Sequence, residues 1–150
     1  YGWAIFMGGI IGSLMWFNVW FIIWPAQQVV MASATRVKEG GHAIPDRAAR
    51  GARGGVASRT NTLLSIPMLF FMGAASHWAF FTPTAKPAKW TMMIVFLIIL
   101  AIVEGNAVVG PATPDKASAG KKLLSTVSGT FWAGFVPTAI FVIAPKPIFG

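Results

Sequence analysis

The sequence predicts an all-α integral membrane protein with four transmembrane helices and a short interfacial helix after the first. Hydrophobic residues make up 55% of the 150 residues, and the mean hydropathy is +0.66. Charged residues make up 11%, whereas soluble domains usually carry about 25%. Four apolar segments have roughly the 20 residues that a membrane-crossing helix needs. Strands of a membrane barrel would be about half as long and would alternate in polarity, so helices are favoured.

The first predicted span, residues 3–24, contains both small and polar residues. Gly8 and Gly12 form a GxxxG pair, which would let another helix or a partner subunit approach closely. Asn18 carries an amide that lipid cannot satisfy. We expect Asn18 to bond to a neighbouring helix, with a ligand contact as the alternative.

Residues 25–60 are predicted to form the first cytoplasmic loop. Pro25 would lie at the membrane interface, where a missing backbone donor is easier to tolerate, and residues 26–38 would form the interfacial helix. Residues 40–59 are interpreted as a solvated Gly/Arg-rich loop. Four arginines of this loop are candidates for docking to lipid head groups or to an acidic partner: Arg47, Arg50, Arg53 and Arg59.

The second predicted span, residues 61–81, contains Pro67, which should kink it. Gly73 and Ser76 belong to a small-residue patch suited to helix packing. His77 follows near the outer end and could ligate haem, or bond to a carbonyl group or water.

The third predicted span, residues 90–109, contains Glu104, the one acidic residue within a span. An intramembrane carboxylate is a candidate functional residue; Glu104 could instead pair with a nearby Lys or Arg. Asn106 could assist either role. The second cytoplasmic loop, residues 110–122, leads to the fourth span, residues 123–144, where Gly129 is a packing candidate.

The distribution of basic residues predicts the orientation. The two long loops hold nine Lys and Arg residues, against three on the opposite side. Positive charge favours the cytoplasmic side, so we expect a multi-pass protein of an inner (cytoplasmic) membrane with both termini outside. The basic residues are spread over loops between apolar segments, which favours lipid rather than nucleic acid as their partner.

The residues of the chain form no recognisable catalytic motif. There is no cysteine, and therefore no disulfide, thiolate metal site or covalent haem attachment motif. His42 and His77 are the two histidines, and they are predicted on opposite sides of the membrane. We therefore expect no catalytic site, metal or intrinsic cofactor, and haem only if a partner shares its ligation.

Two stretches resemble the bacterial urate oxidase N-terminal domain family: GSLMWFNVWFIIWPAQQVV at residues 12–30, and residues 45–78. The shared pattern is an Asn-Val-x-Phe-Ile-Ile-x-Pro-x-Gln run, a basic Gly/Arg segment, Asn-Thr-x-x-x-x-Pro-x-Leu-Phe and a late His-aromatic pair. The resemblance implies the membrane part of a urate hydroxylase linked to a cytochrome c domain. Long members carry a histidine where this chain has Thr60. The last two spans match in hydropathy only.

Three functions remain open from the sequence. The first is a non-catalytic accessory subunit of a larger bacterial membrane redox complex, such as an oxidase, a monooxygenase or a photosynthetic assembly. It would contact lipids and other membrane subunits of a hetero-oligomer. The second is the membrane part of a urate- or purine-oxidising enzyme that passes electrons to cytochrome c. The third is a small transporter, suggested by Asn18 and Glu104.

Overall fold

The computed structural model describes residues 2–77 and 86–143, and the regular elements in them are all helices. A five-residue π-helix, η1, connects the first two α-helices. In chain order the elements are α1 (Gly2–Asn18), η1 (Val19–Ile23), α2 (Trp24–Lys38), α3 (Arg47–His77), α4 (Lys86–Val108), α5 (Ala119–Leu123) and α6 (Val127–Ile143). The predicted all-helical class is therefore confirmed.

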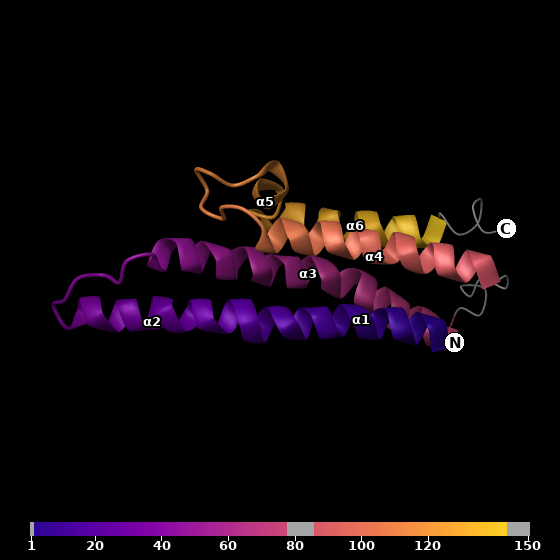
Figure 1. Ribbon diagram of the computed structural model, residues 1–150, viewed down its shortest axis with the longest axis horizontal. Coiled ribbons are helices and arrows are strands. Elements are labelled where there is room, and N and C mark those ends of the chain that lie inside the picture. The colour runs from indigo at the N-terminus through magenta and orange to yellow at the C-terminus, as the bar shows by residue number, and fades with distance from the viewer. Residues whose placement is uncertain (1, 78–85, 144–150) are drawn as a thin grey trace.

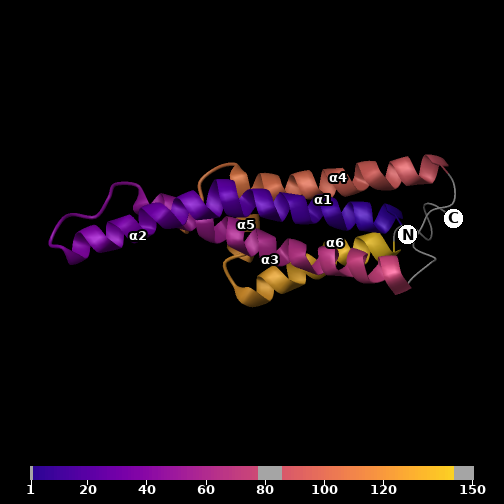
Figure 2. The ribbon, with the colours of Figure 1, turned by 90° about the horizontal axis from the view of Figure 1, so that it is seen from below.

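The helices lie side by side in an elongated bundle (Figures 1 and 2). α1, η1 and α2 run on as one long rod, and α3 returns along it in the opposite direction. α3 is the central helix, because it contacts α1, η1, α2, α4 and α6. α2 and the first turns of α3 project beyond the ends of α4 and α6 as a helical hairpin.

The π-helix explains how the chain passes Pro25 without a break. Proline lacks an N–H, and its ring would collide with the carbonyl four residues earlier in an α-helix. In η1 the backbone hydrogen bonds span five residues instead of four, and the Trp24 N–H donates to the carbonyl of Val19. The predicted boundary at Pro25 is thus a change of helical register within one rod.

The interpretation of residues 40–59 as a loop was wrong, because α3 already begins at Arg47. Glycine weakens an isolated helix, but here it permits close packing against α2. A Cβ on Gly54 would lie 2.9 Å from the Cβ of Ala26. The connection that remains, residues 39–46, is held by a 3.0 Å hydrogen bond from the Ile44 N–H to the Ser33 hydroxyl.

Two further boundaries differ from the prediction. The fourth predicted span, 123–144, is interrupted, since α5 ends at Leu123 and α6 begins at Val127. Arg59 and Thr130 bind the carbonyl of Leu124 at this break. The second predicted span is the later part of α3, and its last residues, 78–81, lie outside the described residues.

The core is built from three phenylalanines on three helices. Phe71 of α3, Phe96 of α4 and Phe141 of α6 lie with ring centroids 5.4 to 5.7 Å apart. Phe71 and Phe96 are fully buried. Such ring pairs each contribute about 0.5–1.5 kcal/mol beyond their buried area. Met7 and Ile11 bring α1 into the same cluster.

Pro67 leaves a backbone carbonyl of α3 without its helical donor at the contact between α3 and α6. It is fully buried, and α3 continues through it as one helix. α3 is curved along its length (Figure 1). Because Pro67 has no N–H, the carbonyl of Leu63 loses its helical donor. Gly134 of α6 covers this carbonyl, and a Cβ on Gly134 would lie 2.8 Å from the Leu63 oxygen. The absence of a side chain at Gly134 therefore allows the two backbones to approach.

Two helical segments of the described chain are long and apolar enough to cross a membrane, judged by length and composition alone: Gly2–Lys38, which includes η1, and Lys89–Val108. Val127–Ile143 is apolar but has 17 residues.

Candidate functional site

A buried polar cluster connects α1, α3 and α4. The side-chain amide nitrogen of Asn18 donates to the Asn61 Oδ1 and to the Glu104 Oε2, both at 3.0 Å. The amide nitrogen of Asn61 donates in turn to the Met15 carbonyl, also at 3.0 Å. Asn18 has no exposed surface. The sequence predicts a helix partner for Asn18, and the structure places two there.

Local structure sets the position of this cluster. Asn18 is the last residue of α1, immediately before the π-helix. Asn61 lies in the middle of α3, and Glu104 lies one turn before the end of α4. π-helical turns are often found at functional sites. The cluster therefore lies where the long rod changes register.

The cluster contains buried oxygen atoms without a hydrogen-bond partner in the described residues. They are Asn18 Oδ1 and Glu104 Oε1. Thr60, the residue before Asn61 in the chain, also has a buried hydroxyl oxygen without a partner. Buried polar atoms usually have a partner, and an unsatisfied one costs about 1–3 kcal/mol. A proton on the Glu104 carboxyl group or a bound water would supply a missing donor. The cluster can thus hold a proton or a small hydrogen-bond donor.

An apolar groove of about 480 Å³ borders the cluster. Side chains of α1 and α4 line it, including Ile10, Phe17 and Leu97, and Glu104 is the one charged residue among them. The expectation that Glu104 pairs with Lys or Arg is not met in the described residues, where its bonding partner is an amide. Asn106 accepts instead from the Ser118 hydroxyl at 3.0 Å, away from Glu104.

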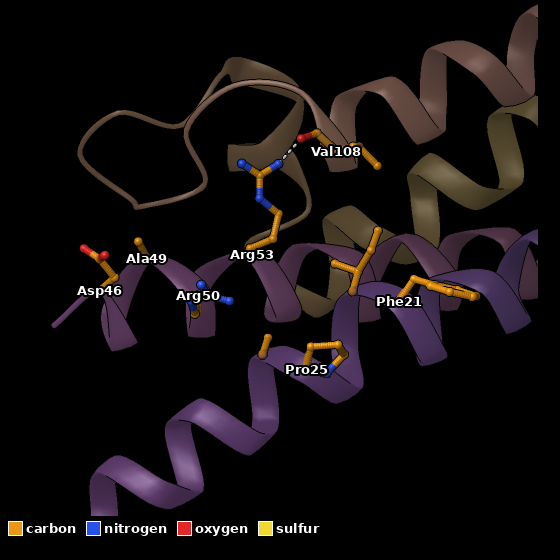
Figure 3. A pocket seen from close by; sticks show the side chains of 9 residues that line it. Phe21, Pro25, Asp46, Ala49, Arg50, Arg53 and Val108 are labelled. Atoms are coloured by element: carbon orange, nitrogen blue, oxygen red, sulfur yellow. Dashed lines mark hydrogen bonds between the residues drawn. The ribbon is translucent and has the colours of Figure 1, made fainter. Parts of the chain in front are cut away.

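Two of the four candidate docking arginines bind backbone carbonyls within the chain. Arg53 donates to the carbonyls of Ala107, Val108 and Gly110, at the C-terminal end of α4 (Figure 3). Arg59 donates to the carbonyls of Leu124 and Ser125, at 3.1 and 2.7 Å. Carbonyls at a helix end have no helical donor, and a cation there also offsets the helix dipole.

The other two arginines are exposed. Arg47 and Arg50 lie in the first turns of α3. Within the described residues, no side-chain hydrogen bond of either is found. The structure thus divides the predicted docking set into two capping arginines and two exposed ones.

Lys121 has a structural role that the sequence analysis missed. Its side chain is 3% exposed, and its Nζ donates to the carbonyls of Val109 and Pro111. Burial, and then the positive charge of Arg53, lower the pKa of Lys121 from its ordinary value of 10.5. The neighbouring Lys122 is exposed. Because the two lysines are adjacent and identical in type, the sequence could not show which of them is buried.

The glycine pair of α1 packs within the chain. A Cβ on Gly8 would lie 3.1 Å from the Met72 sulfur, and one on Gly12 would lie 3.7 Å from the Met68 sulfur. Both methionines belong to α3, which approaches α1 along this face. Gly8 and Gly12 therefore serve the internal α1–α3 contact.

The remaining candidate packing residues lie in different surroundings. Gly73 and Ser76 are exposed, and a Cβ on Gly73 would meet nothing within 4 Å. Gly129 lies in the first turn of α6, where a Cβ would collide with the Leu123 carbonyl. Its N–H donates to the Thr126 hydroxyl at 3.1 Å.

The two histidines lie toward opposite ends of α3, because His42 precedes its first residue and His77 is its last. His77 is exposed at the end of α3, with its Nδ1 3.1 Å from the Gly73 carbonyl. His42 is exposed in the turn between α2 and α3. In the part of the chain that the structure describes, no three His, Cys, Asp or Glu residues gather as a metal site would require.

Comparison with known protein families identifies the family to which the chain belongs. The sequence model described as urate oxidase N-terminal matches residues 2–118. The chain belongs to the urate oxidase N-terminal family. The match covers α1 to α4, including Asn18, Asn61 and Glu104, and ends before α5. It therefore extends over the third predicted span, where the sequence resemblance was one of hydropathy only. No curated protein and no solved structure gave a significant match.

Proposed function

We propose that this member of the urate oxidase N-terminal family is a non-catalytic integral membrane subunit of a larger bacterial redox complex. In this proposal the α1–η1–α2 rod, α3, α4 and α6 cross the membrane. Both termini lie outside, and the hairpin of α2 and α3 projects into the cytoplasm. The partners are membrane lipids and other membrane subunits, and any haem would be shared with such a subunit.

The observation that supports membrane insertion is a reversed polarity between interior and surface. The interior holds Asn18, which is fully buried, with Asn61 and Glu104 bonded to it. The surface of α4 and α6 exposes large apolar side chains along its length: Trp90, Ile94, Ile98, Ile102, Val127, Trp132, Phe135, Val136 and Ile143. A soluble protein rarely exposes so much contiguous apolar surface, whereas lipid or neighbouring subunits would cover it.

The accessory role is supported by how the polar residues are used. Arg53, Arg59 and Lys121 bind the chain's own carbonyls, and Asn18 holds three helices in register. These contacts build a rigid scaffold. The projecting hairpin carries Arg47 and Arg50 at its surface, where a partner subunit can reach them.

Gentle extraction from the native membrane tests the proposal. A native gel should show the chain co-migrating with redox subunits, and haem absorbance should follow those subunits rather than this chain. A chain that migrates alone would contradict the accessory role. Recovery in the soluble fraction after membrane disruption would contradict membrane insertion.

Family membership favours a second candidate, the membrane part of a urate- or purine-oxidising enzyme that passes electrons to cytochrome c. Thr60, which stands where long members carry histidine, is fully buried and directly precedes Asn61 in the chain. In this candidate, a partner would supply the redox ligands. Urate-dependent reduction of cytochrome c in membranes that contain the chain, and its loss on deletion, would support it.

A further inference from the structure

We propose that a groove beside Arg50 binds the phosphate head group of an anionic phospholipid. The groove has a volume of about 520 Å³ and lies between η1, α2, α3 and the end of α4 (Figure 3). Phe21, Pro25, Arg50, Arg53 and Val108 are among its lining residues. This inference rests on the membrane placement proposed above.

The charges of the groove favour an anion. Arg50 and Arg53 supply two guanidinium groups, and Asp46 is the one carboxylate that lines the groove. Asp46 lies at the end of the groove away from Val108 (Figure 3). The sum of these charges is therefore positive. A guanidinium group matches the geometry of phosphate oxygens and binds them with two parallel hydrogen bonds.

The two arginines contribute differently. Arg53 is turned toward the end of α4, where its nitrogens already donate to three carbonyls. Carbonyl oxygens carry no net charge, so Arg53 still contributes a positive field. Arg50 lies one turn earlier on α3 and is exposed. Arg50 is thus the guanidinium with donors available to a phosphate group.

The apolar side of the groove points to a lipid rather than to free phosphate. Phe21 is 59% exposed and Val108 is 45% exposed, although both are large apolar side chains. Trp24, which follows on the same rod, is 50% exposed. Tryptophan is enriched where hydrocarbon meets head groups. An amphiphile would cover these side chains with its acyl chains while its phosphate meets Arg50.

Native mass spectrometry of the full chain in detergent tests this site. Phosphatidylglycerol would be titrated against wild type, Arg50→Gln and Arg47→Gln. Arg47 is the matched control, because it is an exposed arginine of the same helix that does not line the groove. A basic residue that lies against an anionic head group contributes about a fivefold change in affinity. We expect a loss of about fivefold for Arg50→Gln and less than twofold for Arg47→Gln.

Two further arms identify the source of the anion. Phe21→Ser leaves all charges in place and should also weaken phosphatidylglycerol binding, because it removes an acyl contact. Inorganic phosphate at millimolar concentration should not displace the lipid. Equal losses for the two arginine variants, tight binding of phosphatidylcholine, or displacement by phosphate would each overturn the lipid site.

Membrane fractionation separates this inference from the proposed function. A chain found in the membrane fraction, but with no difference between the arginine variants, contradicts the lipid site alone. A chain found in the soluble fraction contradicts the membrane placement on which the site rests. Circular dichroism of each variant verifies that the helices have formed.

Discussion

The side-chain amide of Asn18 lies 3.0 Å from the carboxylate of Glu104, although the two residues are 86 positions apart in the chain. Asn61 completes the contact from a third helix. Within an apolar bundle, such interhelical bonds contribute about 0.6–2 kcal/mol and fix which faces of the helices meet. The cluster therefore connects α1 to both α3 and α4.

Replacing Asn18 tests this role directly. Asn18→Leu removes the donor to Asn61 and Glu104 and leaves their oxygens buried without it. We expect the free energy of unfolding to fall by about 1–3 kcal/mol. Thermal unfolding in detergent, followed by circular dichroism, measures the loss. Ser13→Ala is the control, because Ser13 is exposed and bonds only to Gly9 in its own helix. Equal stability of the two variants would contradict the role of Asn18 in holding the three helices together.

Glu104 variants separate hydrogen bonding from charge. Glu104→Gln keeps an acceptor for Asn18 and adds a donor that the unpaired Asn18 Oδ1 can accept from. We expect it to be as stable as wild type or more so, whereas Glu104→Leu should lose about 1–3 kcal/mol in the free energy of unfolding.

The same Glu104→Gln variant tests the transporter hypothesis. If Glu104 carries protons in transport, Glu104→Gln should abolish proton flux into liposomes while the protein stays folded. Unchanged flux would remove the transporter hypothesis.

Glycine variants test the close approach of α3 and α6. A side chain at Gly134 would meet the Leu63 carbonyl and the Ile66 side chain. Gly134→Leu should therefore cost about 1–3 kcal/mol by overpacking. Gly73→Ala is the matched control, since Gly73 is exposed on a helix with free space around it. It should raise helix stability by about 0.5–1 kcal/mol. Thermal midpoints that shift in the same direction for both would contradict the packing.

Arg53→Gln should change the titration of Lys121. The variant removes the positive charge that helps to lower the pKa of Lys121, so this pKa should rise toward 10.5. Because the pKa of Lys121 is lower in the folded chain than in the unfolded chain, Lys121 favours folding more as pH rises through the interval below 10.5. NMR titration of the lysine side chains measures the shift. Arg59→Gln, which caps a different helix end, should leave the Lys121 titration unchanged.

Single cysteines test the proposed orientation. The chain has no native cysteine, so one introduced thiol reports one position. Ala43→Cys, in the exposed turn between α2 and α3, should react with an impermeant maleimide only after the cells are opened. Ser76→Cys, exposed near the other end of α3, should react in intact cells. The reverse pattern would place the termini in the cytoplasm.

The sequence by itself determined the helical class, because its long apolar segments do not alternate in polarity as strands would. It also showed that Asn18 needs a partner, since that requirement is local to the residue and its apolar neighbours. The resemblance over residues 12–30 and 45–78 predicted the family that the profile match confirms.

The tertiary structure decided which residues meet. Asn61 gave no signal as the partner of Asn18, because pairing depends on how α3 is rotated against α1. Residues 47–59 were interpreted as a loop because glycine and arginine are typical of loops. They form a helix, and Gly54 packs closely against Ala26 of α2. The helix propensities of residues 47–59 could not predict this contact between two helices. Arg53 and Lys121 became capping residues only when the end of α4 was brought beside them. Hydropathy is a property of a segment, whereas register and capping depend on contacts between segments.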